Sequence, residues 1–73
     1  MASTLTAIAR ARAEKGLTLR EVELLSGVHR DTVHAAERRT RRPHLTTLAK
    51  IARSLGLDLQ EVLEDYMPAE GAA

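Results

Sequence analysis

Cysteine, tryptophan and phenylalanine are absent from this 73-residue chain, and Tyr66 is its only aromatic residue. Without cysteine the chain can form no disulfide and no thiolate-ligated metal site. Its core must be aliphatic, and a chain of this length buries only a modest core. No apolar run approaches the length of a membrane span, and the first residues lack the apolar segment of a signal peptide. We therefore expect a cytoplasmic protein with no membrane-spanning segment.

The residues that are present give a globular composition with an uneven distribution of charge. Hydrophobic residues make up 44% of the chain and charged residues 29%, which is typical of a single small globular domain. Residues 1–57 contain all eleven Lys and Arg and five acidic residues, a net charge of +6. Residues 58–73 contain five acidic residues and no basic one. This segregation favours a polyanionic partner for the first part, with the acidic end facing away from it.

Apolar residues recur at helical spacing throughout, and no segment alternates with a period of two. The pattern predicts five short helices in an all-α domain over residues 1–67, followed by a flexible tail at residues 68–73. We expect the first helix at about residues 4–15 with Ser3 as its cap, and the third at about 29–38. Capping boxes at Thr18-x-x-Glu21 and Asp58-x-x-Glu61 open the second and fifth, and the fourth follows Pro43. The expected inward-facing residues of the five helices are Leu5, Ile8, Ala9 and Arg12; Val22 and Leu25; Val33 and Ala36; Leu45, Leu48, Ala49, Ala52 and Leu55; and Leu59, Val62, Leu63 and Tyr66.

The connection between the second and third helices is the most informative one. Only about three residues join them, and Gly27 is placed where a positive φ is needed. Two helices joined so tightly must cross steeply, which makes a helix-turn-helix. One side of the third helix then faces the core and the other side is free.

The segment "GLTLREVELLSGVHRDTVHAAERRTRRPHLTTLAKIARSLGLDLQEVL" resembles the Cro/cI-type helix-turn-helix family, also called XRE-like or lambda-repressor-like. The resemblance runs from about Leu5 to Leu63 and implies a five-helix lambda-repressor-like fold. Three features depart from the family pattern. Glu23 replaces the usual Ala at the turn, so the contact there is expected to be looser or salt-bridged. Arg39 replaces a common Gly after the third helix, and the usual Ser or Thr caps are His29 and His44, which are poorer caps.

The resemblance implies that the third helix enters the DNA major groove with its N-terminal end first. The helical wheel places Asp31, His34, Ala35 and Arg38 on the side opposite the core, with Arg30 flanking them at the open end. Arg30 has the geometry to read guanine, whereas Asp31 would either accept from cytosine or hold Arg30 in place. His34 would donate to a base or a phosphate, and Ala35 would contact a thymine methyl group. The alternative for each is simple solvent exposure.

Four arginines lie within five positions just after this helix. If the helix docks as the resemblance implies, this loop lies beside the phosphate backbone. The alternative is a solubilising loop. The candidate phosphate contacts are Thr18, Arg20, His29, Arg38, Arg41 and Arg42.

Arg12 and Glu37 fall on the apolar sides of their helices, where a lone charge is costly. Their opposite signs predict a buried ion pair between the first and third helices, and the resemblance implies the same pair.

Enzymatic and metal-binding alternatives find little support. The chain has no nucleophile elbow, no glycine-rich phosphate loop and no pair of carboxylates expected to face a cleft. His29 and His34 lie five positions apart, which splits them across a helix, and no acidic residue completes a ligand set. We expect no catalysis, no metal and no cofactor.

Two functional hypotheses remain. The first is a sequence-specific transcriptional repressor that binds an inverted repeat in double-stranded DNA as a homodimer, in the cytoplasm and at the nucleoid when bound. The second is a protein-interaction module, such as an antitoxin that binds a toxin or another regulator and represses its own operon. Leu24, Tyr66 and Met67 would serve a dimer or a partner.

Overall fold

The computed structural model describes residues 5–66, and this part of the chain contains five helices and no strand. The all-α, five-helix prediction is confirmed. The predicted tail, Met67 and Ser3 lie outside the described residues. The helices are α1 (Ala7–Lys15), α2 (Leu19–Ser26), α3 (Arg30–Arg38), α4 (Leu45–Leu55) and α5 (Leu59–Glu64).

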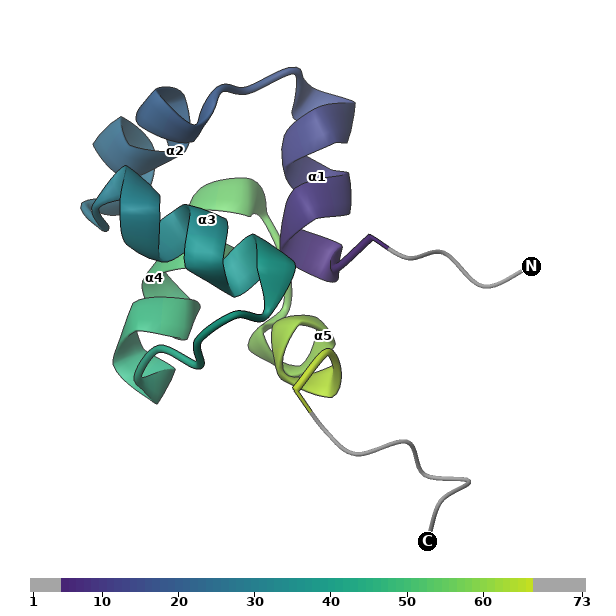
Figure 1. Cartoon of the computed structure of the whole chain (residues 1–73). Coiled ribbons are helices and arrows are strands. Elements are labelled where there is room, and N and C mark those ends of the chain that lie inside the picture. The colour runs from purple at the N-terminus through teal and green to yellow at the C-terminus, as the bar shows by residue number, and fades with distance from the viewer. Residues whose placement is uncertain (1–4, 67–73) are drawn as a thin grey trace, which may run out of the picture.

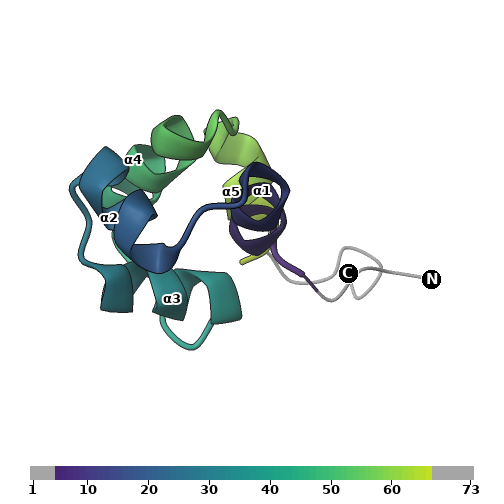
Figure 2. The ribbon, with the colours of Figure 1, turned by 90° about the horizontal axis from the view of Figure 1, so that it is seen from above.

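The helices pack so that α3 lies along one side of the molecule. Helix α2 contacts both α3 and α4, and α1 contacts α3, α4 and α5. Figure 2 shows α3 at one edge of the fold, with α4 toward the opposite edge. In Figure 1, α3 lies between α2 on one side and the loop that leads to α4 on the other. The fold therefore leaves one long side of α3 uncovered by other helices.

The core is aliphatic, as expected, but three leucines predicted to face inward are exposed. Leu5 is 52% exposed, Leu25 60% and Leu45 55%. Leu5 precedes the first turn of α1, Leu25 lies on the outer side of the last turn of α2, and Leu45 begins α4 beyond the packed region. Ala9 and Ala49 are only partly buried. The largest fully buried side chains are Ile8, Val22, Val33, Leu48, Ile51, Leu55 and Val62.

The start of α2 follows the predicted cap, whereas the starts of α1 and α3 differ from the prediction. The capping box of α2 is formed, because Glu21 N donates to Thr18 Oγ1 at 3.0 Å and Thr18 N donates to Glu21 Oε1 at 2.8 Å. At α1, however, the cap is Thr6 and not Ser3, since Ala9 N donates to Thr6 Oγ1 at 3.2 Å. His29 is a better cap than expected, because its Nδ1 accepts from Asp31 N at 3.0 Å.

Arg39 ends α3 in a left-handed conformation, with a φ of 57°. Among the described non-glycine residues it alone has a positive φ, a conformation that costs an L-residue about 1–2 kcal/mol. Its amide donates to the carbonyl oxygen of Ala36 at 3.3 Å, so the cap forms despite the missing glycine. Arg39 therefore ends α3 in a left-handed conformation that is strained for a residue with a side chain.

Arg39→Gly is expected to raise the free energy of unfolding by about 0.5–1 kcal/mol. Glycine removes the strain, and the side-chain hydrogen bond that it loses within residues 5–66 is an exposed one, from Arg39 Nη1 to Asp65 O at 3.2 Å. Denaturant titration measures the change. Arg39→Ala is the control: it loses the same bond but keeps the strain, so a gain equal to that of glycine would contradict the explanation.

The end of α5 is fastened to α1 and α3. Ala7 N donates to Asp65 Oδ2 at 2.8 Å, and the Tyr66 hydroxyl donates to Ala36 O at 2.9 Å. Burial, followed by the nearby Asp65, raises the pKa of Tyr66 and keeps this hydroxyl protonated. Arg39 Nη1 also donates to the backbone carbonyl oxygen of Asp65 at 3.2 Å, so the end of α5 lies beside the C-terminal end of α3.

Candidate nucleic-acid interface

The turn between α2 and α3 has the predicted geometry. Gly27 has a φ of 78°, and its amide donates to Glu23 O at 2.8 Å. Val28 N then donates to Ser26 Oγ at 3.1 Å, and the Val28 side chain is buried in the core. These contacts hold the two helices at a fixed angle.

The side of α3 that faces away from the core carries the residues predicted to read bases. Val33 and Ala36 are fully buried, which fixes the rotation of the helix about its axis. The opposite side accordingly exposes Arg30, Asp31 and His34, and it leaves Ala35 partly exposed. The four candidates therefore occupy one accessible surface.

Arg30 has an acidic neighbour, but it is not Asp31. Arg30 Nη1 lies 3.5 Å from Glu23 Oε1 on α2. The carboxylate of Asp31 lies instead 3.7 Å from His29 Nδ1. Of the two roles left open for Asp31, the one of holding Arg30 has no contact to support it within residues 5–66, where Glu23 meets Arg30 instead. Of the two alternatives left open for Glu23, the salt-bridged one is present.

Arg12 and Glu37 meet between α1 and α3. Arg12 Nε donates to Glu37 Oε2, and Arg12 Nη2 donates to Glu37 Oε1 at 3.0 Å. Arg12 Nη1 also donates to Leu17 O at 2.8 Å. The Glu37 side chain is 5% exposed and that of Arg12 26%. The hydrogen bond to Glu37 raises the pKa of Arg12 further above its already high value, so Arg12 keeps its positive charge.

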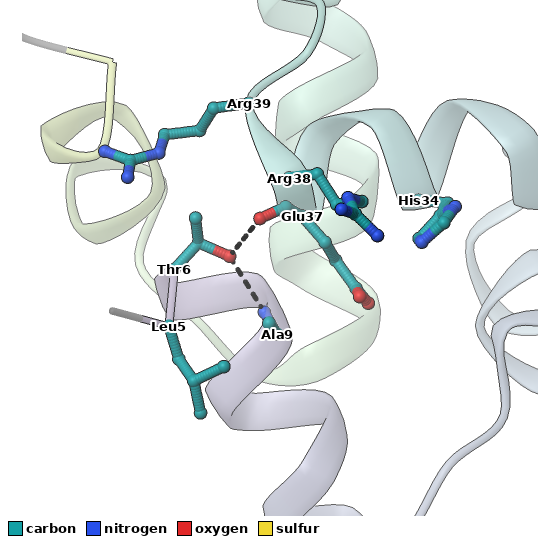
Figure 3. Close-up of a pocket in the computed structure, with 7 residues that line it drawn as sticks. All are labelled: Leu5, Thr6, Ala9, His34, Glu37, Arg38 and Arg39. Atoms are coloured by element: carbon teal, nitrogen blue, oxygen red, sulfur yellow. Dashed lines mark hydrogen bonds between the residues drawn. The ribbon is translucent and has the colours of Figure 1, made fainter. Parts of the chain in front are cut away.

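Thr6 adds a second connection between the same helices. Figure 3 shows its hydroxyl between Ala9 and Glu37, where it donates to Glu37 O at 2.9 Å. His34 and Arg38, which precede and follow Glu37 along α3, line a pocket together with Thr6 and Glu37. The N-terminus of α1 therefore supports the C-terminal half of α3.

The basic loop after α3 borders a hollow between α3 and α4. Arg41 and Arg42 are exposed and line it together with Thr32 of α3 and Thr47 of α4. His44 lines it too, and no side chain in the described part of the chain caps α4 there. The first-turn amides of a helix favour anions. Two arginines and a helix N-terminus thus border one opening.

The remaining phosphate candidates are also accessible. Thr18 and Arg20 are exposed at the start of α2, and the Thr18 hydroxyl accepts in the capping box while its proton stays available to a further acceptor. Arg38 and His29 are exposed at the two ends of α3.

Sequence reasoning missed three features of this surface. It did not identify Glu23 as the partner of Arg30, Thr6 as an anchor of α3, or Thr32 and Thr47 as lining of the hollow. The sequence did contain a sign of the Glu23–Arg30 contact, since an acidic side chain at the turn either pairs with a cation on the next helix or stays in water. The other two depend on which helices pack together.

Two further observations concern metal binding and membrane insertion. Within residues 5–66, no three His, Asp or Glu side chains gather where they would hold a metal ion. None of the helices in this range is both long and apolar enough to cross a bilayer.

Comparisons with known proteins agree with this geometry. The model of a family described as "Helix-turn-helix" matches residues 8–62, from α1 into α5. The chain is 42% identical over 55 residues to y4dJ of Sinorhizobium fredii, described as an uncharacterised HTH-type transcriptional regulator. That alignment covers 75% of this chain and 71% of the relative. No solved structure matches the chain significantly.

Proposed function

Because the chain belongs to the Cro/cI-like helix-turn-helix family of DNA-binding regulators, we propose that it is a sequence-specific repressor that binds double-stranded DNA with α3 in the major groove. The observation that carries the proposal is the uncovered side of α3, which has candidate phosphate contacts on both flanks. The activity consists of binding alone, without a catalytic step or a cofactor.

Arg30, at the N-terminal end of α3, is the proposed guanine reader. Its side chain is half-exposed, and a guanidinium has five donors, so contact with Glu23 leaves others for O6 and N7 of guanine. In this arrangement Asp31 would accept from cytosine, His34 would donate to a base or a phosphate, and Ala35 would touch a thymine methyl group. These roles follow from the accessible side of α3 and from the family.

The proposed phosphate contacts lie on both sides of α3. On the α2 side they are Thr18, Arg20 and His29, and on the other side they are Arg38, Arg41 and Arg42. Contacts on both walls of the groove would hold α3 in register, since phosphate contacts position a protein while base contacts specify the site.

A domain of this size covers too little DNA for high specificity, so we propose that two copies bind an inverted repeat. Two-fold symmetry would place the half-site centres about 10–10.5 base pairs apart, or a multiple of that spacing. Binding over a promoter would repress transcription and would place the protein at the nucleoid in the cytoplasm.

In vitro selection of duplexes by the purified chain tests the proposal. We expect enriched sequences with two inverted half-sites at a helical-turn spacing. Failure to bind any duplex in low salt would refute DNA binding, and enrichment of a single half-site would refute the homodimer.

Arg30→Ala is expected to cost about 1–3 kcal/mol on the selected site and to relax the preference at one base pair per half-site. Binding to random DNA should barely change, because a base contact contributes little to it. Competition binding with the four variants of each base pair measures both effects. An equal loss on every sequence would show that Arg30 contacts a phosphate instead.

A second candidate function is an antitoxin-type or other protein-interaction module. The observation that favours it is an apolar hollow at α2, lined by Leu17, Leu24 and Leu25, the last two being exposed. Exposed apolar patches of this kind are typical of protein contacts. Leu24→Gln together with Leu25→Gln should leave DNA binding unchanged while abolishing partner binding; a loss of sequence-specific DNA binding would place this surface in the first function instead.

A further inference from the structure

The carboxylate of Glu23 lies at the junction of the two helices that form the turn. Its Oε1 is 3.5 Å from Arg30 Nη1, and its Oε2 is 4.0 Å from His29 Nε2. Because His29 Nδ1 accepts from Asp31 N, the neutral ring carries its proton on Nε2, the nitrogen that faces Glu23. One carboxylate therefore faces both residues at the start of α3.

Glu23 is better fixed in place than Arg30. It lies in the last turn of α2, where its carbonyl oxygen accepts from Gly27 N, and its side chain is 24% exposed. The Arg30 side chain is 49% exposed, and Glu23 is the acceptor that it contacts within residues 5–66. The more rigid group thus restrains the more mobile one.

From this contact we propose that Glu23 is a positioning residue that sharpens the base preference of Arg30 at the cost of affinity for all DNA; the inference rests on the function proposed above. A guanidinium must be held in one plane to bind guanine through two bonds, and immobilising such a side chain on binding is costly. The contact with Glu23 already restricts the Arg30 side chain in the free protein, so less conformational entropy is lost when DNA binds. A carboxylate so near the DNA also repels phosphates, whatever the sequence.

Positioning of Arg30 favours binding to the correct base, whereas the charge of Glu23 weakens binding to all DNA. Two variants of Glu23 separate these effects. Glu23→Asp keeps the charge but withdraws the carboxylate by one methylene. We expect its binding to random DNA to match the original protein, while discrimination at the Arg30-dependent base pair falls by about two- to tenfold. Glu23→Gln removes the charge, so random DNA should bind about two- to fivefold more tightly, with a similar loss of discrimination.

Glu21→Gln is the matched control. Glu21 lies on the same helix, is exposed, and serves the capping box, in which glutamine also functions. It makes no contact with Arg30 among the described residues, so this variant should keep the full preference at every base pair. A preference that falls in Glu21→Gln as much as in Glu23→Gln would assign the effect to net charge and overturn the proposal.

The measurement is competition binding on the selected duplex with each of the four base pairs at the position that Arg30→Ala relaxes. Unchanged discrimination in Glu23→Asp overturns the positioning role and leaves DNA binding by α3 intact. Higher discrimination in Glu23→Gln also overturns it, because Glu23 would then withhold Arg30 from the base. If Arg30→Ala relaxes no position, both the base reader and this inference are wrong. Thermal unfolding of each variant separates these results from loss of the fold, since an unfolded fraction lowers all affinities equally.

Discussion

Replacing Glu37 with glutamine, or Arg12 with methionine, is expected to lower the free energy of unfolding by about 3–5 kcal/mol. Either change leaves one charge of a mostly buried pair without its partner. A domain of this size has a total stability on the order of 5–10 kcal/mol, so either variant should be close to unfolding at physiological temperature. Both keep roughly the original side-chain volume, so the loss reflects the charge rather than a cavity.

A double-mutant cycle in denaturant titrations measures the coupling. The variant that carries both Arg12→Met and Glu37→Gln should recover part of the loss, because it leaves no lone charge. Recovery should be incomplete, since Arg12 also donates to Leu17 O and the loss of that bond remains. Additive effects of the two changes would contradict an energetic pairing between the helices.

Replacing Arg41 and Arg42 together with glutamine is expected to weaken binding to selected and random duplexes by similar factors. Each phosphate contact contributes a salt slope of about 0.9, so the slope of log K against log salt should flatten by roughly two per protomer. At about 0.1 M salt the loss should be on the order of ten- to fiftyfold per protomer. Titrations of both duplexes at several salt concentrations measure the affinity and the slope.

Arg42 also has a contact within the protein, because its guanidinium carbon lies 5.9 Å from the centroid of the Tyr66 ring. Such a contact contributes about 0.5–1 kcal/mol at an exposed site. If Arg41 and Arg42 have only a structural role, the substitutions will lower the free energy of unfolding and leave the salt slope of DNA binding unchanged. That outcome would contradict the proposed docking of α3.

The control for the change in net charge is a variant that loses two cations from α4 instead of from the basic loop. Lys50 and Arg53 are exposed on α4 and line a different hollow, beside Leu25. Lys50→Gln together with Arg53→Gln changes the net charge by the same amount. Its effect on the slope should be much smaller, because only cations that neutralise phosphates release counterions.

Much of the fold follows from interactions between residues close in the sequence, and these were predictable. The Thr18–Glu21 capping box and Gly27 specify where α2 begins and ends, because both act within a single turn. The spacing of Val33 and Ala36 determines which side of α3 faces inward, and therefore which side carries Arg30. Arg12 and Glu37 were paired correctly because a charge on an apolar side has few alternatives to an opposite charge.

Other features required the tertiary structure. An apolar stripe on a helix does not show how far the neighbouring helices extend along it. Leu25 and Leu45 were therefore expected in the core but are exposed to solvent. The roles of Arg30 and the phosphate contacts stay predictions, because the DNA partner is not part of the chain.

The five helices, the capping box of α2 and the accessible side of α3 could be predicted from the sequence alone, because these depend on contacts within about four residues. Two contacts became visible only in the folded chain: Glu23 rather than Asp31 meets Arg30, and the basic loop shares a hollow with the start of α4. Those contacts depend on the crossing angle between helices and on the path of the loop. Both are set by how all the buried side chains pack together, which no single segment specifies.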